Sequence, residues 1–377
     1  MKNPFQYAEI VTRSDFADRE EEIKELVLDL ESGQNIFLYS PRRYGKTSLI
    51  INVLEELKAK EMMTVYIDCY RISSKKRLLE AYVKAVTTAS SGKIKGLMQV
   101  IKGYMPRIAP KIVLKGDQAP EIEVSYDLKE RELEEFLDQA YDIPQRIAKK
   151  KGQNFVVVFD EFQEILRLNG LQLEKEMRSK FQHHQNVAYV FMGSKRHLLE
   201  DMFLDVNRPF YKMGKMISLS KIPEHKFAPF LESKFTSTGF VLEGDVIGKV
   251  LKMTNNLPYY AQLFCHNLWN YFLDTKKISS QDVDWALEKS IRGQSDAFIT
   301  IWDGLSLHQR AVVGSLSKSK GKAVFSKNFI KENDLTSPAS IQTSLNLLSK
   351  KYLVEKENNS YYITDPFFAQ WIKMEMV

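Results

Sequence analysis

The sequence predicts an α/β fold in which a parallel β-sheet, covered by helices on both faces, is followed by an all-α lid and a C-terminal winged helix. Three observations lead to this prediction. Strand-like runs that are apolar throughout alternate with helix-like segments up to about residue 220, as in a parallel sheet buried on both faces. Residues 221–300 have only helical patterns, and residues 301–377 read as short helices followed by a hairpin. We therefore expect three domains, at residues 1–220, 221–300 and 301–377.

The first predicted domain alternates strands and helices. The strands are expected at Asn35–Tyr39, Thr64–Cys69, Asn154–Asp160, Asn186–Gly193 and, as an edge strand, Lys215–Leu219. Apolar residues at helical spacing predict helices at Arg19–Leu30, Thr47–Leu57, Lys75–Ala89 and 129–150. Two β-like runs, Lys111–Lys115 and Glu121–Tyr126, flank a polar turn, so we expect a β-hairpin insert near residues 108–127.

The last predicted domain ends in the helix Pro338–Lys350 and two strands, Tyr352–Glu355 and Tyr361–Thr364. Ser337 is a suitable N-cap, with Pro338 in the first turn. The apolar stripe of the helix leaves four short polar residues to face outward, namely Ser340, Thr343, Ser344 and Asn346. Such side chains suit a recognition helix in the DNA major groove.

A lysine-rich stretch precedes that helix and could contact phosphates. It consists of Lys318, Lys320, Lys322, Lys327 and Lys331. Residues 300–377 carry ten Lys or Arg against seven Asp or Glu, which is a weak excess for a DNA-binding module. The predicted partner of the winged helix is therefore either DNA or protein.

Composition places the chain among ordinary globular proteins. Of its 377 residues, 44% are hydrophobic and 27% are charged, which excludes a disordered or fibrous chain. The run Phe155–Phe159 is far shorter than the roughly 20 residues that cross a bilayer, and the segment after Met1 lacks the apolar core of a signal peptide. We expect a cytoplasmic protein that contacts no membrane. The net charge of +6 permits an anionic partner without identifying one.

Cysteines and histidines indicate neither a disulfide nor a metal site. Cys69 and Cys265 are far apart in the sequence, and we expect both to be buried as small hydrophobic side chains. His183 and His184 are adjacent and therefore point to different sides of a helix, with no third Cys or His nearby. A metal site needs more ligands than this pair supplies.

A phosphate-binding loop is the central motif. The segment Ser40–Ser48 follows a predicted strand and opens a predicted helix, which is the context of a Walker A loop. Its backbone N–H groups and the helix N-terminus would face phosphates. Ser40 stands where the motif has its first glycine, and we expect the turn there to carry some strain. The candidate nucleotide-contacting residues are Ser40, Pro41, Arg42, Arg43, Tyr44, Gly45, Lys46, Thr47 and Ser48.

A pair of acids after the most apolar strand completes the motif. Asp160 and Glu161 end the run that begins at Phe155, as in a Walker B strand. Asp160 is expected to hold Mg²⁺ together with the Thr47 hydroxyl, and Glu161 to orient or deprotonate the attacking water. Two acids after a strand are a weak signal alone. With the upstream loop they predict Mg²⁺-dependent hydrolysis of a nucleoside triphosphate.

Seven segments carry a resemblance to a known family, namely Phe16–Glu20, Tyr39–Leu49, Phe159–Gln163, Met192–Ser194, Arg208–Tyr211, Leu257–Tyr260 and Asp365–Phe367. Together they resemble the archaeal-type predicted ATPases, a family of the AAA+/STAND group of P-loop ATPases that is also found in bacteria. The resemblance covers essentially the whole chain. It implies a fold of the AAA+/STAND type and ATP or ADP as the nucleotide.

The resemblance also implies roles that patterning does not show. Phe16 and Arg19 would lie near the adenine. Ser194 would be a polar sensor of the γ-phosphate, although it could instead cap the following helix. Arg208 would be an arginine finger or nucleotide sensor, or else an ion-pair residue. Pro258 would contact nucleotide from the lid, or else only interrupt a helix.

The residues leave three functional hypotheses open. The first is an ATP-driven conformational switch with slow turnover, and the second is a DNA-associated ATPase that uses its winged helix. The third is a nucleotide-binding scaffold without hydrolysis, against which the intact set of Lys46, Thr47, Asp160 and Glu161 argues. ATP-dependent homo-oligomers are compatible with all three.

Overall fold

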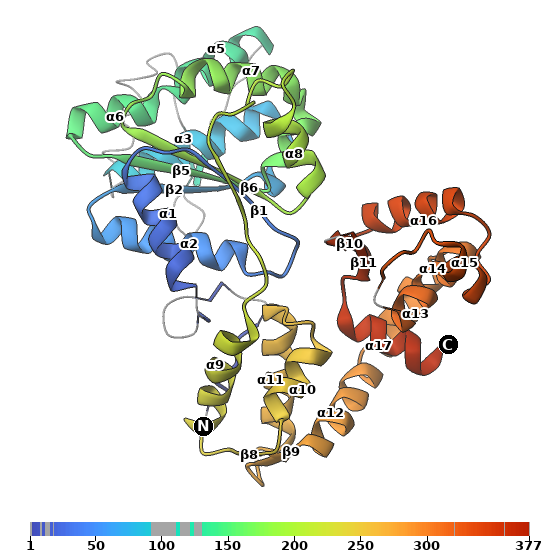
Figure 1. Cartoon of the computed structure of the whole chain (residues 1–377). Coiled ribbons are helices and arrows are strands. Elements are labelled where there is room, and N and C mark those ends of the chain that lie inside the picture. Colours follow the sequence, from blue (N-terminus) through green and yellow to red (C-terminus); the bar gives the residue numbers. More distant parts are fainter. Residues whose placement is uncertain are drawn as a thin grey trace. The chain divides into compact units, whose positions relative to one another are not determined.

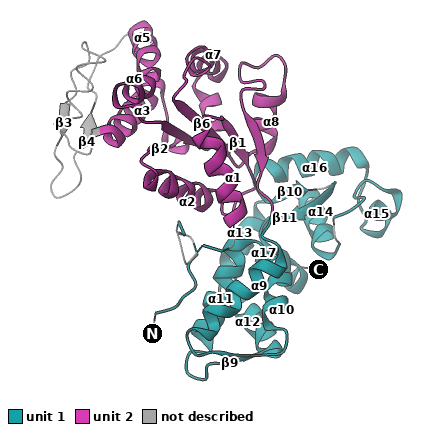
Figure 2. Ribbon diagram, turned by 60° about the vertical axis from the view of Figure 1, so that its left-hand side comes forward, with its two compact units in different colours: residues 1–18, 221–377 teal, residues 19–220 magenta. Residues whose placement is uncertain are grey.

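The computed structural model describes residues 2–7, 10–11, 16–17, 19–91, 111–113, 121–123, 130–319, 321–357 and 359–376. These residues belong to two compact units (Figure 2). Unit 2 is Arg19–Ser220, and unit 1 combines Met1–Asp18 with Lys221–Val377. The chain therefore passes between the units twice, before Arg19 and after Ser220. The division into three domains, with a further boundary near residue 300, stays a prediction.

Unit 2 is built on a five-stranded parallel sheet, as the sequence predicts (Figure 1). Its strand order is β2-β5-β6-β1-β7, and each neighbouring pair is parallel. The strands are β1 (Ile36–Tyr39), β2 (Met63–Asp68), β5 (Phe155–Asp160), β6 (Val187–Gly193) and β7 (Lys215–Ser218). β5 and β6 are buried along their whole length, and β7 lies at the predicted edge.

Helices cover both faces of this sheet (Figure 1). One face carries α1 (Glu20–Glu31) and α2 (Lys46–Ala59). The other carries α3 (Lys75–Ser91), α5 (Glu130–Tyr141), α6 (Ile143–Lys151), α7 (Gly170–Phe181) and α8 (Arg196–Leu204). On this second face the Phe191 ring stacks 5.2 Å from Phe37 and 5.7 Å from Phe159, measured between centroids. Rings of this size bury a large apolar area, so they fix three neighbouring strands in register.

The predicted hairpin insert is described only in its strands. β3 (Lys111–Val113) pairs antiparallel with β4 (Glu121–Glu123). The predicted turn between them, at residues 116–120, lies outside the described residues.

The part of unit 1 that follows residue 220 begins with a segment that is mostly helical and also contains two short strands. Its helices are α9 (Glu224–Thr236), α10 (Val246–Met253), α11 (Pro258–Tyr271), α12 (Ser280–Arg292) and α13 (Ser295–Asp303). The prediction of helix alone for residues 221–300 is wrong, because β8 (Val241–Glu243) pairs in parallel with β9 (Lys277–Ser279). Three residues are too few for a recognisable strand period, and most of β8 is exposed.

The C-terminal part of unit 1 has the predicted order of three helices and a hairpin. The elements are α14 (Leu307–Lys318), α15 (Lys327–Glu332), α16 (Pro338–Lys350), β10 (Val354–Glu357) and β11 (Ser360–Ile363). The strands pair antiparallel. Ser337 caps α16 through a reciprocal bond pair with Ser340, which confirms the predicted N-cap. A further helix, α17 (Pro366–Glu375), was not predicted.

One predicted outward residue of α16 faces inward. Ser344 is buried, and its hydroxyl lies 2.8 Å from Nδ1 of His308 on α14. The prediction of an exposed Ser344 is therefore wrong, because the buried stripe of α16 includes the position beside Leu345.

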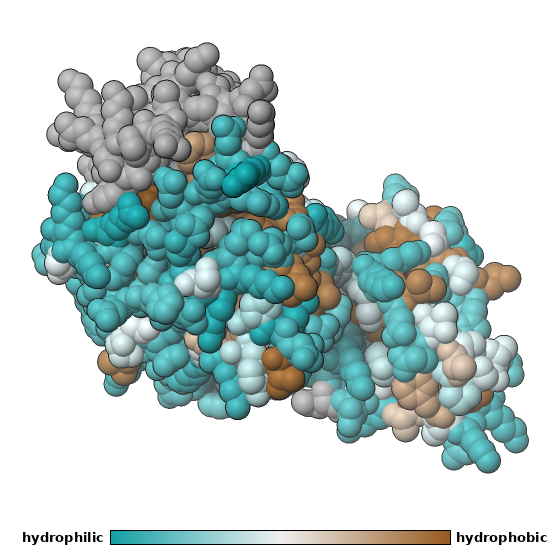
Figure 3. Space-filling view, turned by 90° about the horizontal axis from the view of Figure 1, so that it is seen from above, coloured by the Kyte–Doolittle hydropathy of each residue, from teal (hydrophilic) through white to brown (hydrophobic). Residues whose placement is uncertain are grey.

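No helix within the described ranges is both long enough and apolar enough to cross a membrane. The face of the molecule in Figure 3 is largely hydrophilic, with its hydrophobic residues in small patches.

Candidate nucleotide-binding site

The loop between β1 and α2 has two residues in the left-handed region. Arg43 has φ 71° and Gly45 has φ 84°, and a Cβ at Gly45 would meet no atom within 4 Å. Ser40 is fully buried and is not among the residues with positive φ. The expected strain at Ser40 is therefore absent. A glycine is dispensable there because the backbone does not need left-handed geometry.

The strand order brings three site segments to one edge of the sheet. β6 lies between β1 and β5, and in this register Tyr39 is opposite Gly193. Since all strands are parallel, their carboxyl ends share one edge. Ser194 therefore follows the strand that lies between the phosphate-binding loop and the carboxylates.

Asp160 binds two hydroxyl groups at this edge. The Thr47 hydroxyl donates to Oδ2 of Asp160 at 3.2 Å, and the Tyr66 hydroxyl donates to the same oxygen. A hydroxyl and a carboxylate are the hard oxygen ligands that Mg²⁺ takes in P-loop proteins. The donor set of Thr47 and Asp160 therefore fits the predicted metal.

Glu161 is held from three sides. Its backbone is left-handed, with φ 47°, which is uncommon for a residue other than glycine and often marks a functional position. Its Oε1 lies 3.8 Å from Nζ of Lys46. Its Oε2 accepts hydrogen bonds from Oγ of Ser194 at 2.8 Å and from Nε2 of Gln163.

The pKa values of the two carboxylates are shifted in opposite directions. Burial raises the pKa of Asp160, and neither Lys46 nor the Tyr66 hydroxyl reverses this. Burial also acts to raise the pKa of Glu161, but Lys46 and the hydrogen bonds from Gln163 and Ser194 outweigh it, and the pKa is lowered. Glu161 is therefore ionised near neutral pH, as a proton acceptor must be.

Tyr66 and Gln163 are site residues that the sequence analysis did not single out for a role. Tyr66 reaches Asp160 only because β2 is the neighbour of β5. No local pattern in the sequence states which strands are neighbours. Gln163 lies two residues after Glu161, in the 3₁₀ helix η3 (Phe162–Leu168), so its closeness in sequence was the one available signal.

Arg208 contacts a carboxylate of its own unit. Its guanidinium forms two hydrogen bonds with Glu174 of α7, one of them from Nε to Oε2 at 3.1 Å. Glu174 is fully buried, and burial raises its pKa despite the pull of Arg208. Among the described residues, no hydrogen bond or ion pair joins Arg208 to Lys46, Asp160 or Glu161.

Arg19 is buried beside the phosphate-binding loop. Its guanidinium donates to the backbone oxygen of Ser220 at 2.6 Å and to that of Tyr44 at 3.4 Å. It also pairs with Glu22 at 2.9 Å. Phe16 and Pro258 belong to unit 1, Pro258 as the first residue of α11. The adenine and lid roles of these three residues stay predictions.

The sequence also makes predictions on the burial of the two cysteines and on metal binding by the His183–His184 pair. Cys69 and Cys265 are free and buried, as expected. His184 bonds with Tyr189 and Asp142. Among the described residues, no group of three or more His, Cys, Asp or Glu side chains could hold a metal by itself.

Two family models match the chain. An ATPase domain found predominantly in Archaea matches residues 16–260, and a probable winged helix domain matches residues 296–374.

Curated relatives come from the archaeon Methanocaldococcus jannaschii and are named as uncharacterized ATP-binding proteins. MJ0801 is 28% identical over 195 residues, covering 50% of this chain and 48% of the relative. MJ0147 is 31% identical over 163 residues, covering 41% and 42%. The matched regions are thus less than half of each relative's length.

Solved structures share the fold at low identity. The Walker-type ATPase PABY2304 of Pyrococcus abyssi is 18% identical, with a TM-score of 0.68 over 98% of this chain and 99% of that one. The ORC1 protein of Aeropyrum pernix, solved in complex with DNA, is 13% identical, with a TM-score of 0.53 over 96% and 94%.

The predicted fold class is confirmed by these likenesses together with the observed sheet, apart from the short β8–β9 pair in the predicted all-α lid. The family resemblance inferred from the motifs is confirmed by the match over residues 16–260. The chain belongs to this family of ATPase domains found predominantly in Archaea, and its C-terminal part matches a winged helix domain.

Proposed function

We propose that the chain hydrolyses ATP with Mg²⁺ at the carboxyl edge of its sheet. One observation carries the proposal: Glu161 is bound by Ser194 and faces Lys46 at 3.8 Å, while Asp160 meets Thr47. A base, a phosphate-binding lysine and a pair of metal-binding oxygens thus lie together.

Each residue has a role in this proposal. The loop Ser40–Ser48 and Lys46 bind the β- and γ-phosphates, and Thr47 with Asp160 hold the metal. Mg²⁺ supplies positive charge against the phosphate oxygens. Glu161 accepts the proton of the attacking water through its carboxylate, and Ser194 holds that carboxylate in place.

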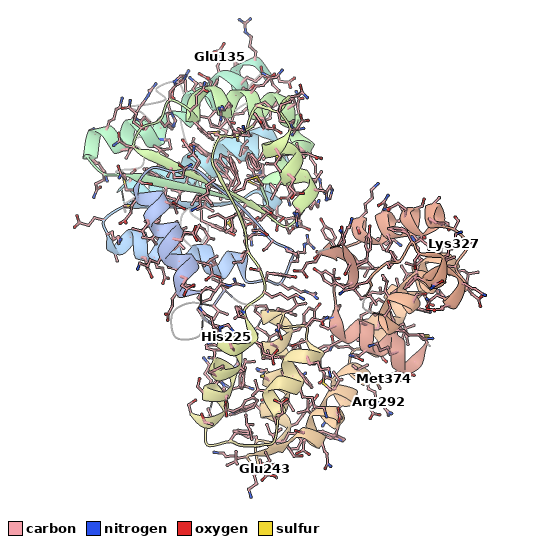
Figure 4. All side chains as sticks on the ribbon, in the orientation of Figure 1. Glu135, His225, Glu243, Arg292, Lys327 and Met374 are labelled. Carbon is pink, nitrogen blue, oxygen red and sulfur yellow. The ribbon has the colours of Figure 1, made fainter. Side chains whose placement is uncertain are left out.

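The test is ATP turnover by Glu161→Gln. The amide keeps the shape of the side chain and loses its basicity, so turnover should fall by about 100-fold or more while ATP binding is retained. Glu135→Gln is the matched control, because Glu135 lies on α5 and points away from the sheet (Figure 4). If Glu161→Gln hydrolysed ATP at the wild-type rate, Glu161 would not be the base.

We further propose that hydrolysis acts as a conformational switch. The support is that the site residues from Ser40 to Ser194 lie in unit 2, whereas the lid and winged-helix segments lie in unit 1. The chain passes between these units twice, so nucleotide-dependent changes in unit 2 have two covalent routes to unit 1. Slow turnover suits such a role.

DNA binding through the winged helix is the second candidate. It is favoured by the winged-helix match and by exposed Gln342, Thr343 and Asn346 on α16. Lys327 points outward at the start of α15 (Figure 4), and Lys318, Lys322 and Lys331 are exposed too. Lys320 lies outside the described residues.

Titration with duplex DNA at several salt concentrations tests this candidate. Lys327→Ala/Lys331→Ala should weaken binding and flatten its salt dependence, because each phosphate contact releases counterions. Lys24→Ala/Lys58→Ala, two exposed lysines of unit 2, should not. If the wild-type chain does not bind duplex DNA at low salt, DNA is excluded and a protein is the remaining candidate partner of the winged helix.

A further inference from the structure

Gln163 is a buried polar residue whose side chain reaches the proposed base. It lies in η3 and is 2% exposed. Its Nε2 donates a hydrogen bond to Oε2 of Glu161, the oxygen that also accepts the Ser194 hydroxyl. The amide and the hydroxyl therefore bind one oxygen of the carboxylate, and the other, Oε1, faces Lys46.

The orientation of this amide follows from charge. Only the NH₂ end of a glutamine can donate to a carboxylate, since the C=O end would bring two acceptors together. With Nε2 toward Glu161, the amide oxygen points the other way, toward Gly193. A Cβ added to Gly193 would lie 1.9 Å from that oxygen, so the glutamine fits only because residue 193 has no side chain.

The amide oxygen of Gln163 is buried and has no hydrogen-bond partner in the described part of the chain. An unsatisfied buried acceptor costs about 1–3 kcal/mol. An apolar side chain of similar length would fill the same space without that cost. Packing alone therefore does not explain a glutamine at this position, whereas its bond to Glu161 does.

We propose that Gln163 is a positioning residue for ATP hydrolysis: with Ser194 it holds Oε2 of Glu161, so that Oε1 is the oxygen that accepts the proton of water. The inference rests on the proposed function, because it assumes that Glu161 is the base. Gln163 itself does not touch the nucleotide in this scheme. Its loss should change the rate of turnover and leave ATP affinity unchanged.

The experiment is steady-state ATP hydrolysis by Gln163→Met, which keeps the length of the side chain and removes the donor. We expect kcat to fall by about 10- to 100-fold, as for the loss of one hydrogen bond to a charged group, with KM unchanged. Unfolding should require at least as much denaturant as in the wild type, because the unpaired oxygen is gone. Gln172→Met is the matched control, since Gln172 is exposed on α7 and its side-chain amide donates to Glu176 on the same helix at 2.9 Å.

A lower kcat at unchanged KM and undiminished stability supports the inference, because a structural residue would lower stability instead. Wild-type kcat in Gln163→Met overturns it. If that variant does not fold, Gln163→Asn decides in the same way, because its amide is one methylene too short to reach Glu161. Turnover by Glu161→Gln is measured alongside. Wild-type turnover in Glu161→Gln refutes the proposed function. If Glu161→Gln loses turnover while Gln163→Met keeps the wild-type rate, only the role of Gln163 is refuted.

Discussion

Arg208 stands in a segment where resemblance implies an arginine finger, yet its guanidinium is bound to Glu174 of its own unit. The carboxylate is fully buried and the arginine side chain is 23% exposed. A buried carboxylate needs a charged or hydrogen-bonding partner. The geometry thus favours the ion-pair interpretation, in which Arg208 binds the segment before β7 to α7.

Arg208→Ala should therefore destabilise unit 2 by about 3 kcal/mol, because it leaves a buried charge without its partner. Burial already raises the pKa of Glu174, and loss of Arg208 raises it further. A carboxyl whose folded pKa lies above its unfolded pKa loses stability as pH rises through the folded value. The defect should thus be larger at neutral pH than under mildly acidic conditions.

Denaturant unfolding at two pH values measures this effect. Adding Glu174→Gln to Arg208→Ala should restore part of the stability, because the amide carries no charge. If Arg208→Ala were as stable as the wild type but slower in turnover, Arg208 would act on the nucleotide.

The positions of those candidate site residues that depend on local sequence were predictable, whereas their roles stay proposals. Lys46 and Thr47 follow from a loop between a strand and a helix, and Asp160 and Glu161 from the end of an apolar strand. Tyr66 was not predictable because its contact with Asp160 requires β2 to lie beside β5. The bond between Arg208 and Glu174 likewise joins residues that are 34 positions apart.

At the scale of elements, length separates what the sequence predicts from what it misses. Strands such as β5 and β6 are long, apolar runs, and α16 has both a cap and a periodic stripe. β8 and β9 have three residues each, so their pairing depends on tertiary context rather than on period. The buried Ser344 shows that a polar residue can lie on an inward face when it finds a partner such as His308.

The cap of α16 gives a prediction for the winged helix. Ser337→Ala removes the side chain that accepts the Ser340 N–H at 3.2 Å, and should lower the stability of this part of unit 1 by about 1 kcal/mol. Ser349→Ala, at an exposed position near the other end of α16, is the control. Hydrogen exchange of α16 amides measures the change. Equal protection in both variants would contradict a stabilising cap.

At the scale of the whole molecule, Arg19 lies where the chain enters unit 2, and it binds the backbone where the chain leaves that unit. The same guanidinium reaches the carbonyl of Tyr44 in the phosphate-binding loop. Two hydrogen bonds of Arg19 therefore join the phosphate-binding loop to both chain connections, as the proposed nucleotide-dependent switch requires.

If the switch operates, hydrogen exchange in unit 1 should differ between ATP and ADP when Glu161→Gln is used to prevent turnover. Arg19→Met should shrink that difference, because it removes the bonds to Tyr44 and Ser220. Arg131→Met is the control, since Arg131 is 92% exposed on α5. Identical exchange of unit 1 in both nucleotides would refute the switch and leave hydrolysis untouched.

The proposals on hydrolysis, on Gln163 and on the switch all require a nucleoside triphosphate in the loop between β1 and α2. Isothermal calorimetry of ATP with wild type, Lys46→Ala and Lys58→Ala addresses this loop directly, because Lys46 begins α2 and Lys58 is exposed near its end. We predict that the wild type and Lys58→Ala bind ATP, and that this binding weakens when EDTA removes Mg²⁺. Lys46→Ala should show no measurable ATP binding. Unchanged affinity in Lys46→Ala would contradict the assignment of the phosphate site.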